Sequence, residues 1–164
     1  MSILVRHAMS EAPTTMGPEM NAADAAGMMR SEDVGVIPVV EDERLLGLVT
    51  DRDLVVRVVA ERRDPTEVKV REVMTHSPVT VSPDTRLSEA RELMAQHRVR
   101  RLPVVKGDHL VGVLSIGDVA WADASTREVG EALRAVSESD GTRELSEDAP
   151  RGTPQRVQEH RESA

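Results

Sequence analysis

The feature that most constrains the fold of this chain is an internal repeat. Residues 5–54 align with residues 70–119 without a gap, at an offset of 65 residues, and 15 of the 50 aligned pairs are identical. The identical pairs are Val5/Val70, Arg6/Arg71, Met9/Met74, Pro13/Pro78, Thr15/Thr80, Pro18/Pro83, Ala25/Ala90, Met29/Met94, Val34/Val99, Pro38/Pro103, Val39/Val104, Val40/Val105, Leu45/Leu110, Gly47/Gly112 and Asp53/Asp118. Two copies at so long a period predict a duplicated small domain, because solenoids and propellers use many copies of about 20–50 residues.

Each copy shows the same order of predicted elements, which is strand, helix, strand, strand, helix. The first helix of each copy is indicated by apolar residues at spacings of three and four, which place them on one helical face. These residues are Ala22, Ala25, Met28 and Met29 in the first copy and Leu87, Ala90, Leu93, Met94 and His97 in the second. A second helix is predicted to begin at Thr50 and to run to about Glu61, with Leu54, Val55, Val58 and Val59 on one face.

The strands of each copy are predicted from β-branched runs joined by short polar turns, a pattern typical of an antiparallel hairpin. The predicted strand pairs are 34–40 with 45–50 and 99–105 with 110–115, and short extended pieces at 13–16 and 78–81 precede the helices. Pro38 and Pro103 lie inside these runs. Proline cannot donate to a strand ladder, so these strands are expected at sheet edges or at a bulge.

The fold class that follows is α/β of the α+β kind. The predicted units are a first motif at 5–64, a second at 70–122, a further helix within 123–136, and a disordered tail at 137–164 that is poor in apolar residues. Each copy is too small for a robust core of its own and presents one apolar sheet face. We therefore expect the two sheets to pack face to face as a pseudo-twofold pair.

Composition excludes several classes of function. The formal charge of −8 makes nucleic acid an unlikely partner, because the phosphate backbone is bound through clustered positive charge. No apolar run approaches the roughly 20 residues needed to cross a bilayer, and the N-terminus lacks a signal-peptide pattern, so a cytoplasmic location without membrane partners is expected. The chain has no cysteine and no histidines at metal-ligand spacing, so no metal site is expected. No nucleophile, metalloprotease or P-loop motif is present, so the chain is not expected to be an enzyme.

The candidate site residues lie at two related junctions of strand and helix. The segments GLVTDRDL (47–54) and GVLSIGDV (112–119) each place a hydroxyl residue, Thr50 or Ser115, three positions before Asp53 or Asp118. A helix start of this kind can hold an anion, because its backbone N–H groups and positive dipole end point outward. The same spacing also describes a capping box, in which the hydroxyl and the acid satisfy backbone N–H groups. The sequence leaves both interpretations open.

The repeated motifs resemble those of a known family. Two copies of the order above, with PxTV-like, LPVV-like and GhhS/TxxD patterns at one offset over roughly residues 5–122, resemble a tandem CBS-domain protein. This paired unit is called a Bateman module, and the resemblance is to the stand-alone bacterial type. It implies two clefts between the motifs, in which adenosine-containing ligands such as AMP, ADP, ATP or S-adenosylmethionine bind.

The resemblance also implies residue roles. In one cleft it assigns the ribose hydroxyls to Asp53, ribose or phosphate to Thr50, and the base pocket to Ser10, Thr15, Val34 and Val36. In the other it assigns Asp118, Ser115, Thr75, Thr80, Val99 and Arg101. Phosphate would meet Arg100 and Arg101 from the opposite copy, because a guanidinium fork suits phosphate oxygens. We therefore expect the Asp53 cleft to be the better site, although Arg98, Arg100 and Arg101 are equally consistent with a solvated strand edge.

The expected function is that of a cytoplasmic regulatory or sensor module. By resemblance the chain is expected to form a homodimer through its helices and to act on a separate protein partner. No cofactor is expected beyond the regulatory nucleotide or related small molecule. The alternative is a dimeric interaction or scaffold module whose clefts stay empty.

Overall fold

The computed structural model describes residues 2–122 and 126–137, which form a mixed α+β fold. The strands are β1 (Ser10–Glu11), β2 (Val36–Glu41), β3 (Arg44–Thr50), β4 (Thr75–His76), β5 (Arg101–Lys106) and β6 (His109–Ser115). The helices are η1 (Val5–His7), α1 (Ala22–Glu32), α2 (Asp51–Leu54), η2 (Val55–Val59), α3 (Val70–Val73), α4 (Leu87–His97), α5 (Ile116–Ala122) and α6 (Thr126–Ser137). The predicted fold class and order of elements in each copy are confirmed.

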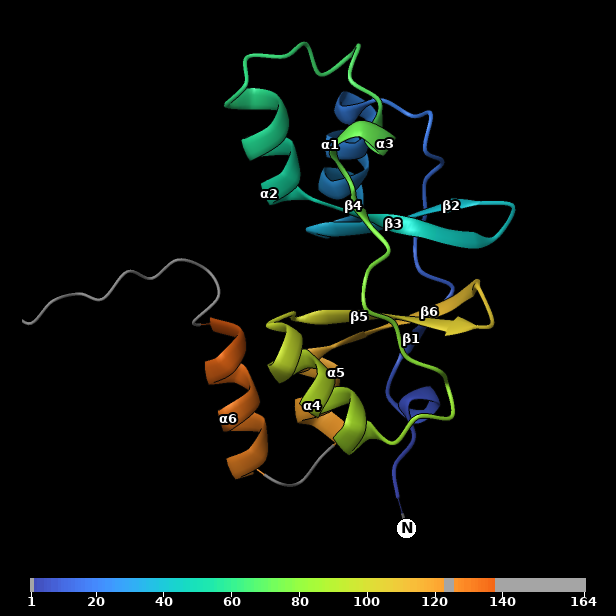
Figure 1. Ribbon diagram of the computed structural model, residues 1–164, viewed down its shortest axis with the longest axis vertical. Helices are drawn as coiled ribbons and strands as arrows, with labels where there is room; N and C mark the ends of the chain where they lie inside the picture. Colours follow the sequence, from blue (N-terminus) through green and yellow to red (C-terminus); the bar gives the residue numbers. More distant parts are fainter. Residues whose placement is uncertain (1, 123–125, 138–164) are drawn as a thin grey trace, which may run out of the picture.

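The two copies lie as two layers with their hairpins toward each other (Figure 1). Hairpin β2–β3 carries α1, α2 and α3 on its outer side, and hairpin β5–β6 carries α4, α5 and α6 on the opposite outer side (Figure 1). All strand pairs are antiparallel, and the hairpins join at their turns, where Arg44 of β3 pairs with His109 of β6. The two layers therefore form one continuous antiparallel sheet instead of two separate sheets.

The prolines in the hairpins lie where their missing N–H is tolerated. Among the named strands of the described residues, β2 pairs only with β3 and β5 only with β6, so Pro38 and Pro103 are on edge strands. On the outer side of each, a single residue, Met16 or Val81, adds an isolated parallel bridge. The register shifts between Val39 and Val40, and between Val104 and Val105. Both expectations for these prolines therefore hold, because each lies on an edge strand close to a bulge.

The leading segment of each copy packs into the other copy. Strand β1, at the start of the first copy, pairs with β6, and β4, at the start of the second copy, pairs with β3. The buried cores show the same exchange: Val5 packs in the core of the second copy, whereas Val70 packs in the core of the first. Each core is thus completed by residues contributed from the other repeat, which ties the two small units together.

Two glycines make this exchange possible by allowing a close approach of backbones. A Cβ on Gly47 would lie 2.5 Å from the carbonyl oxygen of Thr75, and one on Gly112 would lie 2.8 Å from that of Ser10. Real Cβ atoms essentially never come this close to backbone atoms. A glycine inside a strand often marks such an approach, and here it admits β4 and β1 to the hairpins.

The helix after β3 departs from the predicted pattern. It starts as α2 and continues as the π-helical η2, in which the Ala60 N–H donates to the Val55 carbonyl oxygen at 2.9 Å. Val58 is 1% exposed, but Val55 is 58% and Val59 is 68% exposed. The predicted apolar face of Leu54, Val55, Val58 and Val59 is therefore only half buried. In this helix Leu54 and Val58 face the core, whereas Val55 and Val59 lie on the neighbouring, exposed side.

The chain continues beyond the repeat as α6, where the apolar spacing predicts a helix. This helix packs against α4 and buries Ala132 and Val136. The predicted disordered tail at 137–164 lies outside the described residues apart from Ser137, which is the last residue of α6. Across the described helices, none combines the length and the apolar character required to cross a bilayer.

Candidate functional site

Each strand–helix junction forms a capping box. At the second junction, Asp118 Oδ2 accepts hydrogen bonds from the Ser115 N–H at 2.7 Å and from the Ser115 hydroxyl at 2.7 Å. The same hydroxyl accepts from the Asp118 N–H at 3.1 Å. Thr50 and Asp53 repeat the pattern at 2.9, 2.9 and 3.1 Å. The capping interpretation is thus confirmed for both junctions, and it engages one carboxylate oxygen of each acid.

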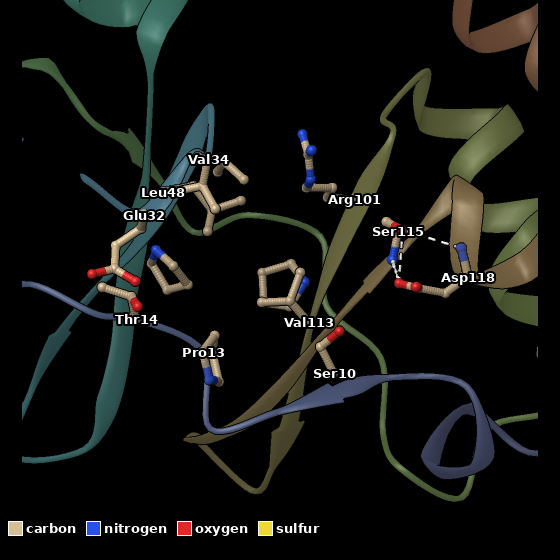
Figure 2. Close-up of a pocket in the computed structure, with 13 residues that line it drawn as sticks. Ser10, Pro13, Thr14, Glu32, Val34, Leu48, Arg101, Val113, Ser115 and Asp118 are labelled. Atoms are coloured by element: carbon tan, nitrogen blue, oxygen red, sulfur yellow. Dashed lines mark hydrogen bonds between the residues drawn. The ribbon is translucent and has the colours of Figure 1, made fainter. Parts of the chain in front are cut away.

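A cavity of about 310 Å³ lies between the two copies. Its lining consists of Ser10, Pro13, Thr14, Glu32, Val34, Val36, Pro38 and Leu48 from the first copy and Arg101, Pro103, Val113, Ser115 and Asp118 from the second. Figure 2 shows Glu32, Val34 and Leu48 on one side of this space and Arg101, Ser115 and Asp118 on the other. An apolar wall with a few polar groups at its ends is typical of a small-molecule site.

The structure groups the predicted residues differently from the expectation. Ser10, Val34 and Val36 were assigned to Asp53, but they line the cavity that contains Ser115 and Asp118. The strand exchange explains this, because Ser10 on β1 pairs with Val113 of the second copy. The reverse holds for Thr75. It was assigned to the cleft of Asp118, but it pairs with Leu48 of the first copy.

The resemblance assigned Arg101 to both clefts. The structure places it in the lining of the Asp118 cavity, and Asp53 does not line that cavity. Arg101 starts β5 and pairs directly with Ser115 at the end of β6, so the hairpin register places it beside Asp118. The argument that Arg101 makes the Asp53 cleft the better site therefore fails.

Seven of the predicted residues do not line this cavity, namely Thr15, Thr50, Asp53, Thr75, Thr80, Val99 and Arg100. Thr15 and Thr80 precede Met16 and Val81, whose N–H groups bond to the carbonyl oxygens of Pro38 and Pro103. Val99 packs against the core of the second copy, and the carbonyl oxygen of Arg100 accepts from the Ile116 N–H. Their place in ligand binding stays a prediction.

Comparison with known proteins identifies the family. The family model described as "CBS domain" matches twice, over residues 5–60 and 70–125. The chain belongs to the CBS-domain family. The two copies are therefore two CBS motifs, and the recognition made from the sequence is confirmed.

Relatives and solved structures agree with this assignment. The CBS domain-containing protein YhcV of Bacillus subtilis is 40% identical over 133 residues, which cover 81% of this chain and 94% of that protein. A crystal structure of CBSX2 in complex with AMP is 30% identical, with a TM-score of 0.65, and the match covers 73% of this chain and 95% of that one. A hexameric CBS-CP12 protein from bloom-forming cyanobacteria is 26% identical, with a TM-score of 0.66 and 85% coverage of both chains.

The two acids of the CBS motifs have different surroundings. Asp53 Oδ1 lies 3.7 Å from Arg57 Nε, and Arg57 Nη1 donates to the carbonyl oxygens of Val73 at 2.8 Å and Met74 at 3.2 Å. The repeat places Ala122 where Arg57 stands in the first motif. Among the described residues no ion pair to Asp118 is found. Asp53 is thus tied to the exchanged segment, whereas Asp118 keeps an oxygen for the cavity.

Several lining residues were missed by reasoning from the sequence. Pro38 and Pro103 are identical in the two motifs, but they were interpreted only as strand-edge signals. Glu32 ends α1, and an acid at a helix end resembles any solvated side chain in the sequence. The one available signal for the exchange was the glycine in each strand, which implies a close backbone neighbour. In the described part of the chain, no cluster of three or more His, Cys, Asp or Glu residues could hold a metal ion.

Proposed function

We propose that this CBS pair is a non-catalytic cytoplasmic regulatory module that binds an adenosine-containing ligand in the Asp118 cavity. The observation that carries this proposal is a cavity between the motifs with Asp118 and Ser115 at one end, a guanidinium beside them and apolar residues opposite. The AMP bound to CBSX2 supports a ligand of this class for the same fold. The candidates are AMP, ADP, ATP and S-adenosylmethionine.

The polar end of the cavity suits ribose and its 5′ substituent. The Asp118 oxygen that the cap does not use can accept hydrogen bonds from a ribose hydroxyl, and a carboxylate is an acceptor only. Arg101 lines the same end and presents a fork of donors that matches a phosphate or a carboxylate. The apolar side chains of Val34, Val36 and Leu48 would hold the base against the other wall.

The ion pair of the first motif favours Asp118 over Asp53. Arg57 forms an ion pair with Asp53 and also donates to the carbonyl oxygens of the segment that crosses from the second motif. A ligand diol at Asp53 would have to compete with this internal partner. We infer that the chain binds one ligand, at Asp118, and that Asp53 has a structural role.

The proposed mechanism is a population shift. The cavity takes its walls from both CBS motifs, so a bound ligand contacts both and stabilises the arrangement in which they are close. A ligand at 100 times its Kd would add about 2.7 kcal/mol to the stability of that arrangement. A separate protein partner would respond to the change.

Isothermal titration of each of the four candidates, together with thermal unfolding, tests the proposal. We expect at least one to bind with a stoichiometry of one per chain, and we expect Asp118→Asn to abolish binding. Asp53→Asn removes the same charge from the other motif and is the matched control, which should retain binding. Loss of binding in Asp53→Asn but not in Asp118→Asn would show that the wrong acid is assigned, and no binding by any candidate would favour an empty scaffold module.

Self-association is proposed as well, because the helices leave apolar side chains uncovered. Val55, Val56 and Val59 are 58%, 47% and 68% exposed, and Trp121 of the second motif is 93% exposed. Trp121 stands at the position that the repeat relates to Val56, so both motifs present an apolar residue on equivalent helices. A homodimer would cover these side chains. The hexameric CBS-CP12 neighbour supports assembly through this fold.

A further inference from the structure

We propose that Glu32 selects the base of the ligand by accepting a hydrogen bond from its exocyclic amine, so that the cavity takes a 6-amino purine and rejects a 6-oxo purine. This inference rests on the proposed function and names the part of the ligand that Glu32 contacts. It concerns one acidic side chain that the repeat does not share, since the related position in the second motif is His97.

Glu32 is exposed at the edge of the cavity, and its carboxylate has no partner among the described residues. It is the last residue of α1, and within the described part of the chain its side chain forms no hydrogen bond or ion pair. An acid in the last turn faces the negative end of the helix dipole, which favours cations instead. His97 suits the corresponding position of α4, whereas Glu32 is unfavourable at the end of α1. The carboxylate of Glu32 is therefore available to a ligand that enters the cavity it lines.

The position of Glu32 in the cavity matches the base end of the ligand. Figure 2 shows Glu32 and Thr14 on the side away from Ser115 and Asp118, with Val34 on the same side. Because Asp118 and Arg101 would hold the ribose and its 5′ substituent, the base must extend toward Glu32. The apolar side chains near Glu32 suit the faces of a flat ring, which leaves the polar edge of the ring for the carboxylate.

The chemistry of the carboxylate then decides between bases. An ionised carboxylate only accepts hydrogen bonds, so it pairs with the amine at position 6 of adenine. Hypoxanthine has a carbonyl oxygen at this position. That oxygen and the carboxylate are both hydrogen-bond acceptors, so no hydrogen bond would form between them. The hydroxyl of Thr14 both donates and accepts, so it does not discriminate. Hydrogen bonds to charged groups are strong enough to give about tenfold selectivity or more.

Titration of AMP and inosine 5′-monophosphate into the full chain tests this assignment. We expect the wild-type protein to bind AMP at least about tenfold more tightly than inosine 5′-monophosphate. Glu32→Gln should bring the two affinities close together, because an amide can pair with either an amine or a carbonyl. Glu32→Ala should weaken AMP without weakening inosine 5′-monophosphate. His97→Gln changes the related position outside the cavity and should keep the wild-type ratio.

The outcomes separate this inference from the proposed function. If AMP binds and Asp118→Asn abolishes binding, but Glu32→Gln leaves the ratio of the two affinities unchanged, the role of Glu32 is wrong and the site stands. If wild-type protein bound the two nucleotides with equal affinity, the role of Glu32 would likewise be wrong and the site would stand. If neither nucleotide binds, the proposed function falls and the inference falls with it. Circular dichroism of each variant confirms that the fold is retained.

Discussion

The exchange of leading segments depends on Gly112, and replacing this residue with alanine tests how the fold builds the site. The new Cβ would lie 2.8 Å from the carbonyl oxygen of Ser10 and 2.9 Å from Met9 Sδ. Ordinary contact begins at 3.4 Å, so β1 would have to retreat by roughly 0.6 Å (3.4 − 2.8). The obstacle is backbone paired in a ladder, which cannot turn aside as a flexible side chain can.

Overpacking of this kind costs about 1–3 kcal/mol. For a chain of this size that corresponds to a fall of roughly 2–12 °C in Tm, since each kcal/mol shifts Tm by about 2–4 °C. We expect Gly112→Ala to lose stability in this range and also to weaken ligand binding, because Ser10 on β1 lines the cavity. Gly47→Ala should cost at least as much stability, because its Cβ would lie 2.5 Å from the Thr75 carbonyl oxygen.

Urea unfolding followed by circular dichroism measures these differences, and Gly27→Ala is the matched control. Gly27 lies inside α1, and a Cβ there would meet no atom within 4 Å. We expect Gly27→Ala to stabilise the protein by about 0.5–1 kcal/mol, as alanine is favoured over glycine in a helix. If Gly112→Ala were as stable as Gly27→Ala, the close approach of β1 to β6 would not hold the motifs together.

Three further predictions concern the cap, the pH dependence and the assembly. Thr50→Ala removes the hydroxyl that accepts from the Asp53 N–H and should cost about 1 kcal/mol in urea unfolding; an unchanged midpoint would contradict the capping role. The Glu72 carboxylate accepts hydrogen bonds from the Lys69 N–H and from the Arg63 guanidinium, and these bonds, the first more than the second, hold the pKa of Glu72 below the ordinary value of 4.5. The ionised carboxylate therefore stabilises the folded protein near neutral pH, and this contribution is lost as the pH falls through the lower folded pKa. Glu72→Gln should therefore have a lower urea midpoint than wild type at pH 7, and the difference should shrink as the pH falls below the ordinary pKa of 4.5. Val59→Glu should convert the proposed dimer to monomers in sedimentation equilibrium, and a dimer that persists would place the interface elsewhere.

The duplication, the secondary structure and the helix caps of this protein are determined by the sequence by itself. The offset of 65 residues establishes the duplication, and the spacing of apolar residues locates the helices and hairpins of each motif. These are local properties, because a helical face and a strand alternation depend only on neighbours within a few residues. The capping boxes are local for the same reason, since the hydroxyl and the acid of each box are three residues apart.

The tertiary structure alone decided how the candidate residues are grouped. Nothing within the first motif shows that Ser10 leaves it to pair with Val113, because that contact joins residues about 100 positions apart. The two motifs carry the same acid, but Arg57 lies beside one of them and Ala122 stands at the related position of the other. The turn type of η2 likewise depends on packing. The repeat therefore specified two equivalent halves, and the long-range pairing made a site from parts of both.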